Sequence, residues 1–325
     1  MVSVIIPVYN GEKYIQTIVN CFEQQINNDF ELIFINDGSK DNSLDELNKA
    51  KKNSFLEIVV MHQNNAGVSS SRNVGIDNAK GELLCFCDVD DEVTKDFISD
   101  MRYVIENNEV DLVICKHQLK KMDGTEKSIS SKLYTGKVEI KDTITCLKDF
   151  LYGRIVSGCC TIMTRKTVII ANNLRFAEGY KYSEDLHMIW RIIAFCPKIA
   201  YLDKSLYIYK LQENSATSKF NSERLHGCTL FRELEVFFEM HIPQFSQEYK
   251  SYGVAKIMWS IAWQAAIYYR FEQFRDFYIK YNVKNEMSKL ILFKNYKVAL
   301  SSITFIMSPA IFRLMAIKFG KKHIH

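Results

Sequence analysis

The chain has 325 residues, of which 47% are hydrophobic, 13% aromatic and 25% charged, with only 13 Gly and 4 Pro. This composition excludes disordered, collagen-like and disulfide-scaffold proteins, and the length predicts one large domain with an appendage. A formal net charge of +4 is too small to indicate a nucleic-acid-binding protein.

The first third of the chain alternates short apolar runs with segments of helical periodicity. Residues 2–8 form a continuous apolar run, which is typical of a strand buried on both faces of a parallel sheet. Further strands are expected at 30–36, 57–62, 83–87 and 111–116, and helices at 14–22, 41–52, 69–78 and 95–107. Such alternation predicts an α/β fold with a doubly wound, mostly parallel sheet.

Polar residues follow several of these strands directly. They are Asn10, Asp37, Asn64, Asp88 and Asp90. Ligands of such sheets bind at the carboxyl ends of the strands, so we expect these side chains to meet at one edge and to form the active site.

The second part of the chain is less regular. Residues 117–141 are polar and predict a loop or hairpin over the site, and a helix at 143–152 and a strand at 159–163 follow. Glu184 and Asp185 open a helix that runs to about 195, and strand patterns return at 199–202 and 207–209. From 222 onward the periodicity is helical, which places a domain boundary near residue 220.

Nine cysteines without paired CxxC spacing predict reduced, buried thiols, and the pairs Cys85/Cys87 and Cys159/Cys160 are expected in apolar strands. The N-terminus shows neither a basic region nor a cleavage site of a signal peptide, so we expect a cytoplasmic protein.

The C-terminal tail, residues 288–325, carries the positive charge. After Glu286 there is no acidic residue and the formal charge is +7, whereas residues 1–286 carry −3. Polar and basic residues recur at helical spacing in it, at Lys294, Lys297, Ser301, Thr304 and Ser308. This predicts an amphipathic helix that lies on an anionic membrane surface through its basic stripe; a packed helix or a homodimer interface is the alternative.

Asp88 and Asp90 offer hard oxygen ligands close together, which suits Mg²⁺ or Mn²⁺. Asp37 could accept hydrogen bonds from a base or ribose, Arg72 opens a helix where phosphate is favoured, and Asp185 is a candidate general base. Taken singly, these residues could equally be turn formers, helix caps or surface charges.

In chain order, these motifs resemble glycosyltransferase family 2. The resemblance rests on Val-Ser-Val-Ile-Ile-Pro-Val-Tyr-Asn, Ile-Asn-Asp-Gly-Ser, Asn-Ala-Gly-Val-Ser-Ser-Ser-Arg-Asn-Val-Gly and Phe-Cys-Asp-Val-Asp-Asp, within about residues 1–116. Ser-Glu-Asp at 183–185 resembles the family's later acidic motif. The resemblance implies a GT-A fold and an inverting transfer from a nucleotide-sugar, usually a UDP-sugar.

The resemblance also implies roles for individual residues. Asp185 falls at the catalytic base and Asp90 at the direct ligand of the metal. Glu184 and His187 are candidates for the acceptor side, and His187 departs from the bulky apolar or aromatic residue that many family members have there. Donor nucleotide contacts are expected from Pro7, Tyr9, Asp37, Asn64, Arg72 and Asp88, the last also near the metal.

These inferences give three regions and a cellular setting. We expect a GT-A catalytic domain at 1–220, with a donor half at 1–116 and an acceptor half at 117–220, and a helical region at 221–325. The family suggests a saccharide or lipid-linked acceptor in capsule, exopolysaccharide or other bacterial surface glycan synthesis, at the inner face of the plasma membrane. A sugar nucleotidyltransferase, and a non-catalytic nucleotide-binding scaffold subunit, are the other functions considered.

Overall fold

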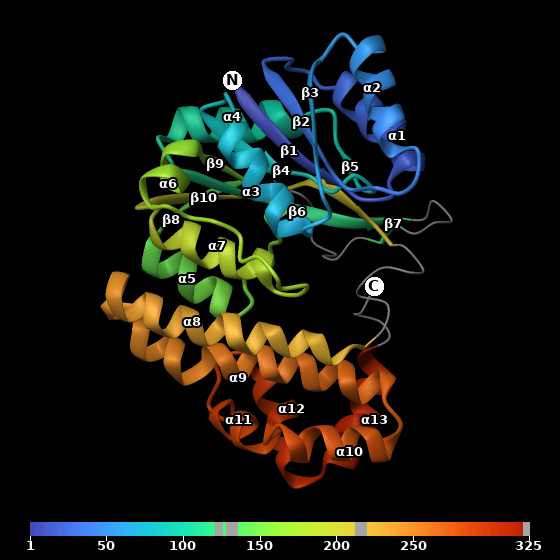
Figure 1. Ribbon diagram of the computed structural model, residues 1–325. Coiled ribbons are helices and arrows are strands. Elements are labelled where there is room, and N and C mark those ends of the chain that lie inside the picture. Colours follow the sequence, from blue (N-terminus) through green and yellow to red (C-terminus); the bar gives the residue numbers. More distant parts are fainter. Residues whose placement is uncertain (121–125, 128–135, 212–219, 321–325) are drawn as a thin grey trace. The chain divides into compact units, whose positions relative to one another are not determined.

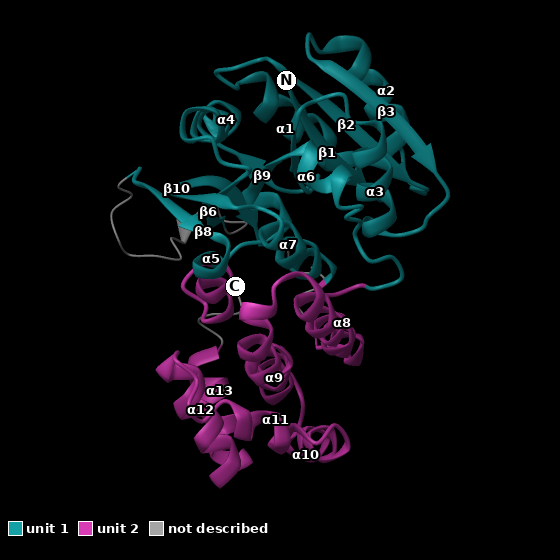
Figure 2. Ribbon diagram, turned by 90° about the vertical axis from the view of Figure 1, so that its left-hand side faces the viewer, with its two compact units in different colours: residues 1–146, 156–180, 184–211 teal, residues 147–155, 181–183, 212–325 magenta. Residues whose placement is uncertain are grey.

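The computed structural model describes residues 1–120, 126–127, 136–211 and 220–320 (Figure 1). The remainder of the expected 117–141 loop, and Lys321 and Lys322 of the tail, lie outside the described residues. The chain divides into two compact units (Figure 2). Unit 1 contains residues 1–146, 156–180 and 184–211, and unit 2 contains 147–155, 181–183 and 212–325.

Unit 1 is built on one mixed sheet. Within the described residues its strands follow the order β3-β2-β1-β4-β9-β6-β10-β5, with β7 paired to β6 and β8 to β10. The strands are β1 (Val2–Val8), β2 (Phe30–Asp37), β3 (Glu57–Gln63), β4 (Leu83–Phe86), β5 (Glu92–Val93), β6 (Leu112–Lys120), β7 (Glu126–Lys127), β8 (Val138–Asp142), β9 (Ile162–Arg165) and β10 (Lys198–Lys210).

Helices connect and cover these strands (Figure 1). They are α1 (Glu12–Glu23), α2 (Ser43–Asn53), α3 (Val68–Asn78), α4 (Phe97–Asn108), α6 (Lys166–Ala171) and α7 (Glu184–Ala194), with a 3₁₀ turn η1 (Cys159–Thr161). Helix α5 (Thr143–Leu151) begins in unit 1, and its residues from 147 onward belong to unit 2. The expected alternation of strands and helices in the first 116 residues is therefore present.

Strands β1 to β4 form the parallel half of the sheet. Their apolar runs suit this position, because strands of a parallel sheet are usually buried on both faces. β1 pairs in parallel with both β2 and β4, and β2 with β3. Helix α3 lies very close to β1, because a Cβ on Gly75 would be 2.3 Å from Ile5 Cγ2 and 3.1 Å from Ile35 Cδ1. Only glycine permits this approach without displacing the strand.

The other half of the sheet departs from the expectation in two places. The patterns at 199–202 and 207–209 belong to one strand, β10, which continues through register shifts around Ser205. Cys159 and Cys160 lie in η1 and not in a strand, which begins only at Ile162. In the turn, the Thr161 amide and hydroxyl both donate to the Gly158 carbonyl, at 3.0 and 2.9 Å. Such local bonds compete with sheet pairing.

Unit 2 is helical. Its helices are η2 (Ser222–Leu225), α8 (His226–His241), α9 (Pro243–Tyr268), α10 (Phe271–Lys280), α11 (Val283–Lys289), α12 (Tyr296–Met307) and α13 (Pro309–Gly320). The long helix α9 begins at Pro243, where the missing amide hydrogen costs nothing. Phe274, Phe305 and Phe312 are fully or almost fully buried and contact one another in the interior of the unit.

The tail does not form the single amphipathic helix that its spacing predicts. Two helices, α12 and α13, meet at Pro309, and Ser301, expected in an outward polar stripe, is 3% exposed. No helix among the described residues is long and apolar enough to cross a bilayer. All nine cysteines are free, and all but Cys21 are buried, as expected.

Candidate functional site

The carboxyl ends of the parallel strands lie along one edge of the sheet. The register pairs Val8 with Asn36 at the end of β1, and Asp37 with Gln63 at the end of β2. β4 pairs with β1 up to Phe86. The predicted residues that follow these strands therefore share this edge, as the sequence indicated.

Asp37 fixes the loop that precedes α3. The residue is 3% exposed, and its Oδ1 accepts hydrogen bonds from Gln63 Nε2 at 2.7 Å and from the Ala66 amide at 2.9 Å. Its Oδ2 accepts from the Gly67 amide at 2.9 Å. A carboxylate can accept about four hydrogen bonds, so one more donor can still be bound. Asn64, in the same loop, is exposed.

The loop after β1 is tied to the loop after β2. Asn10, with φ at +51°, donates from its amide to Ser39 Oγ at 3.0 Å, and its Oδ1 accepts from the Lys40 amide at 2.8 Å. Pro7 is half-buried in β1, and the neighbouring Tyr9 is 49% exposed. The Tyr9 ring is therefore accessible to a planar ligand at this edge.

Asp91 is a buried anchor in the acidic motif. It is 2% exposed, and its Oδ2 accepts from the Tyr207 hydroxyl at 2.6 Å and its Oδ1 from the Lys210 amide at 2.9 Å. The same hydroxyl accepts from the Asp88 amide at 3.2 Å. Burial, and next the charge of Asp88, raise the pKa of Asp91 well above its ordinary value. Asp91 and Tyr207 thus fix the backbone of Asp88 against β10.

Asp88 and Asp90 are more accessible than Asp91. The side chain of Asp88 is 37% exposed and Asp90 is half-buried. Burial, and next the negative charge of Asp88, raise the pKa of Asp90. A divalent cation would neutralise this charge, and Mg²⁺ is usually held by one or two carboxylates together with substrate phosphates. The described part of the chain has no group of three or more His, Cys, Asp or Glu arranged for a metal. A pair of carboxylates fits a cation that a diphosphate helps to hold.

A buried arginine joins the acidic motif to α7. Arg72 is 4% exposed, and its Nη2 donates to Asp88 Oδ1 at 2.9 Å, while its Nη1 lies 3.5 Å from Glu184 Oε1. Its Cζ is 5.3 Å from the centroid of the Phe176 ring. A buried charge is costly unless it is paired, so the three charged groups depend on one another.

Glu184 and Asp185 occupy the first turn of α7, where negative charge suits the helix dipole. Burial, and next the charge of Asp185, raise the pKa of Glu184 to about 7. Burial also raises the pKa of Asp185, which Arg72 opposes. Asp185 Oδ1 accepts from the Leu186 amide at 2.7 Å. A carboxyl group with a raised pKa holds a proton more firmly and is a better base near neutral pH.

His187 lies in the interior of unit 1. It is 6% exposed, and burial, followed by the charge of Arg191, lowers its pKa to about 4. The histidine is therefore neutral near pH 7. Of the two residues predicted on the acceptor side, Glu184 is paired with Arg72 and His187 is buried.

Sequence reasoning missed Tyr207, Phe176 and the structural role of Asp91. Tyr207 stands 116 residues from Asp91, and its strand pattern indicates only a buried aromatic residue. The acidic motif at 88–91 carried the only signal, because adjacent residues such as Asp90 and Asp91 seldom face the same cation.

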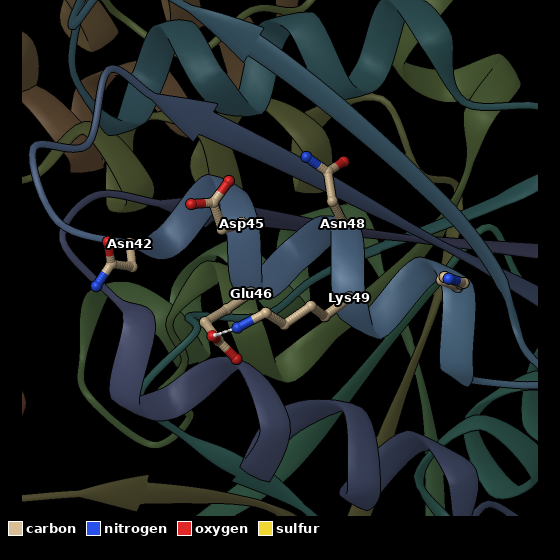
Figure 3. Close-up of a pocket in the computed structure, with 6 residues that line it drawn as sticks. Asn42, Asp45, Glu46, Asn48 and Lys49 are labelled. Carbon is tan, nitrogen blue, oxygen red and sulfur yellow. Dashed lines mark hydrogen bonds and ion pairs between the residues drawn. The ribbon is translucent and has the colours of Figure 1, made fainter.

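A surface depression also lies on α2, away from this set of residues. Figure 3 shows its lining side chains, with Glu46 and Lys49 as an ion pair at 2.6 Å. The depression is lined by Asn42, Asp45, Glu46, Asn48, Lys49 and Lys52. These are ordinary polar residues on the solvent face of a helix, and they include none of the predicted site residues.

The sequence is similar to those of known glycosyltransferases. A family model described as Glycosyl transferase family 2 matches residues 3–169. The glycosyltransferase EpsJ of Bacillus subtilis is 30% identical over 218 residues, which cover 67% of this chain and 63% of EpsJ. The poly(ribitol-phosphate) beta-N-acetylglucosaminyltransferase TarS of Staphylococcus aureus is 27% identical over 64% of this chain and 35% of TarS. The chain thus matches less than two thirds of the length of either relative.

Solved structures show the same fold. Residues 1–349 of TarS in complex with UDP-GlcNAc superpose with a TM-score of 0.70 and 19% identity, over 99% of this chain and 91% of that one. The mannosyltransferase PcManGT of Pyrobaculum calidifontis, in complex with GDP-Man and Mn²⁺, gives a TM-score of 0.59 at 11% identity, over 95% of this chain and 87% of that one. The mixed sheet with its helices is therefore a GT-A fold with a C-terminal helical region.

Proposed function

Because this chain belongs to glycosyltransferase family 2, we propose that it transfers a sugar, with inversion, from a nucleotide-sugar to a saccharide acceptor. The observation that carries this proposal is the buried Arg72. Its guanidinium pairs with Asp88, at the candidate diphosphate site, and with Glu184, the neighbour of the candidate base. One side chain thereby links the candidate site of the leaving diphosphate with the neighbour of the candidate base.

We propose a UDP-sugar as the donor. Two TarS structures are complexes with UDP-GlcNAc and with UDP, which supports a uridine nucleotide for a chain of the same fold. The accessible ring of Tyr9 would stack on the base, with Pro7 and Asn64 beside it. The remaining acceptor position of Asp37 would receive a hydrogen bond from the base or ribose.

Asp90, together with Asp88, would hold Mn²⁺ or Mg²⁺, which supplies a positive charge next to the departing diphosphate. The ion pair with Arg72 orients the Asp88 carboxylate for this purpose. The Tyr207 hydroxyl fixes the Asp88 backbone, so that the motif is ordered before the donor binds.

Asp185 is the proposed general base. Its Oδ1 is engaged by the Leu186 amide, so Oδ2 is the atom that takes the proton from the acceptor hydroxyl. The acceptor oxygen then forms a bond to the anomeric carbon while the bond from that carbon to the diphosphate oxygen breaks. The diphosphate leaves with the bonding electrons from the opposite face, and the anomeric configuration inverts.

The proposed acceptor is a saccharide, or a lipid-linked saccharide, of a bacterial capsule, exopolysaccharide or other surface glycan. The relatives support this class: TarS is named for transfer to poly(ribitol-phosphate). We further propose that residues 288–325 bring the enzyme to the cytoplasmic face of the plasma membrane.

A panel of nucleotide-sugars tests the donor assignment. The full chain, with Mn²⁺, should release UDP from at least one UDP-sugar and show no turnover with GDP- or CDP-sugars. Release of pyrophosphate from UTP and a sugar phosphate would instead show a nucleotidyltransferase. Nucleotide binding without any turnover would favour a non-catalytic subunit.

A further inference from the structure

The last two helices of unit 2 present large apolar side chains to solvent. In α12, Tyr296, Leu300 and Met307 are 72%, 58% and 80% exposed, and in α13, Ile311 and Leu314 are 55% and 65% exposed. We call these five residues the tail face. Within each helix they recur at spacings of three, four or seven, so each helix carries its own outward apolar stripe.

Two serine side chains of α12 are directed inward. Ser301 and Ser302 are 3% and 0% exposed. Ser301 Oγ accepts a hydrogen bond from Trp259 Nε1 at 2.9 Å and donates to the Val298 carbonyl at 2.9 Å. The serines are thus satisfied within unit 2, and the apolar stripe is the side without a packing partner in its own unit. A helix with apolar side chains along its exposed side can lie on a membrane surface with that side buried in the lipid.

Charge indicates what covers the tail face. From Met287 onward the sequence has no acidic residue and a formal charge of +7. Lys297 is exposed on α12 and Lys318 is exposed on α13. A second copy of this chain, docked through the same surface, would bring these lysines together without a carboxylate from this segment. An anionic lipid surface offers both an apolar interior and opposite charge.

We propose that the tail face inserts into the boundary between headgroups and acyl chains of an anionic bilayer. Tyr296, Leu300, Met307, Ile311 and Leu314 enter the apolar layer, and Lys297 and Lys318 extend toward the phosphates. The contact is made by the apolar stripe, so the serine side of α12, which the sequence pattern suggested as the polar face, does not take part. This inference deepens the proposed membrane setting of the enzyme and rests on it.

Vesicle co-sedimentation of the full chain tests the proposal. The variant Leu300→Ser/Met307→Ser should bind vesicles of phosphatidylglycerol and phosphatidylcholine at least about tenfold more weakly than the unmodified chain. The control Val236→Ser/Met240→Ser changes two residues of α8 that are 55% and 67% exposed, and it should bind like the unmodified chain. Vesicles of phosphatidylcholine alone should bind the unmodified chain more weakly.

Two outcomes would overturn the proposal. One is equal vesicle binding by the tail-face variant and the α8 control. The other is that light scattering shows self-association of the unmodified chain, that the tail-face variant loses it, and that neither of these two proteins binds vesicles. A second copy of the chain would then cover the tail face. UDP release measured without vesicles separates this test from that of the proposed function, since it should be the same in all three proteins. A chain that binds vesicles through the tail face but releases no UDP would refute the enzyme assignment alone.

Discussion

Arg72 shows how much of the site depends on single side chains. Its guanidinium is buried and is paired with Asp88 and Glu184, which come from segments far apart in the sequence. Removing one partner from a buried ion pair costs about 3–5 kcal/mol, because the other charge is left without compensation. A change at any one of these three residues therefore affects the other two.

Tyr207→Phe should weaken both stability and donor binding. The change removes the hydroxyl that donates to Asp91 and accepts from the Asp88 amide, and an unsatisfied buried group costs about 1–3 kcal/mol. Urea unfolding measures the first effect and UDP binding with Mn²⁺ the second. Tyr103→Phe, at a residue 65% exposed on α4, should change neither. Equal results for the two variants would remove the anchoring role from Tyr207.

Glu184 should make stability fall as the pH rises. Its pKa is raised from 4.5 to about 7 on folding, so the protonated form is favoured in the folded protein. The contribution is fully present below pH 4.5 and is lost as the pH passes through about 7, with a magnitude of about 3 kcal/mol. Urea unfolding at several pH values should show this loss in the unmodified chain relative to Glu184→Gln. Parallel pH profiles would mean that Glu184 is not the group responsible.

At the scale of elements, local pattern predicted the parallel half of the sheet well. Its strands are continuous apolar runs, and its helices have clear periodicity. The pattern failed where side chains outside the segment decide the outcome. Cys159 and Cys160 read as a strand, but the bonds between Thr161 and Gly158 form a turn. Ser301 read as an outward residue, but Trp259, 42 residues away, binds it inside.

Gly75→Ala tests the close packing of α3 on the sheet. The new methyl group would meet Ile5 and Ile35 in the buried centre of β1 and β2. We expect a loss of about 1–3 kcal/mol from overpacking, against which the better helix propensity of Ala returns about 1 kcal/mol. Ser70→Ala, on the same helix and half-buried, should change stability by less than about 0.5 kcal/mol. Chemical unfolding of both variants measures the difference; equal stability would show that the helix can shift.

At the scale of the whole molecule, the charge divides along the chain. Residues 1–286 carry −3 and include every carboxylate of the candidate site, whereas the rest carries +7. This division and the edge of the sheet at which the parallel strands end could be predicted from the sequence. The pairing of Arg72 with Glu184, and the buried position of His187, required the fold, because contacts across 112 residues leave no periodic signal.

Ligand binding should stabilise the folded chain through linkage. UDP with Mn²⁺, at about 100 times its dissociation constant, should add about 2.7 kcal/mol to the free energy of unfolding. Asp90→Asn should lose the part of this gain that depends on Mn²⁺, because it removes the proposed ligand. Thermal unfolding with UDP alone, with Mn²⁺ alone and with both ligands measures the part of the gain that depends on Mn²⁺. A full gain in the variant would exclude Asp90 as a ligand.

Asp185 is the proposed base that takes the proton from the acceptor, and turnover of Asp185→Asn tests this role most directly. The change keeps the size of the side chain and an oxygen for the Leu186 amide, but it removes the base. Sugar transfer should fall by about 10²- to 10⁴-fold, while UDP binding stays within about twofold of the unmodified chain. Full transfer activity in the variant, with donor and acceptor saturating, would contradict the account.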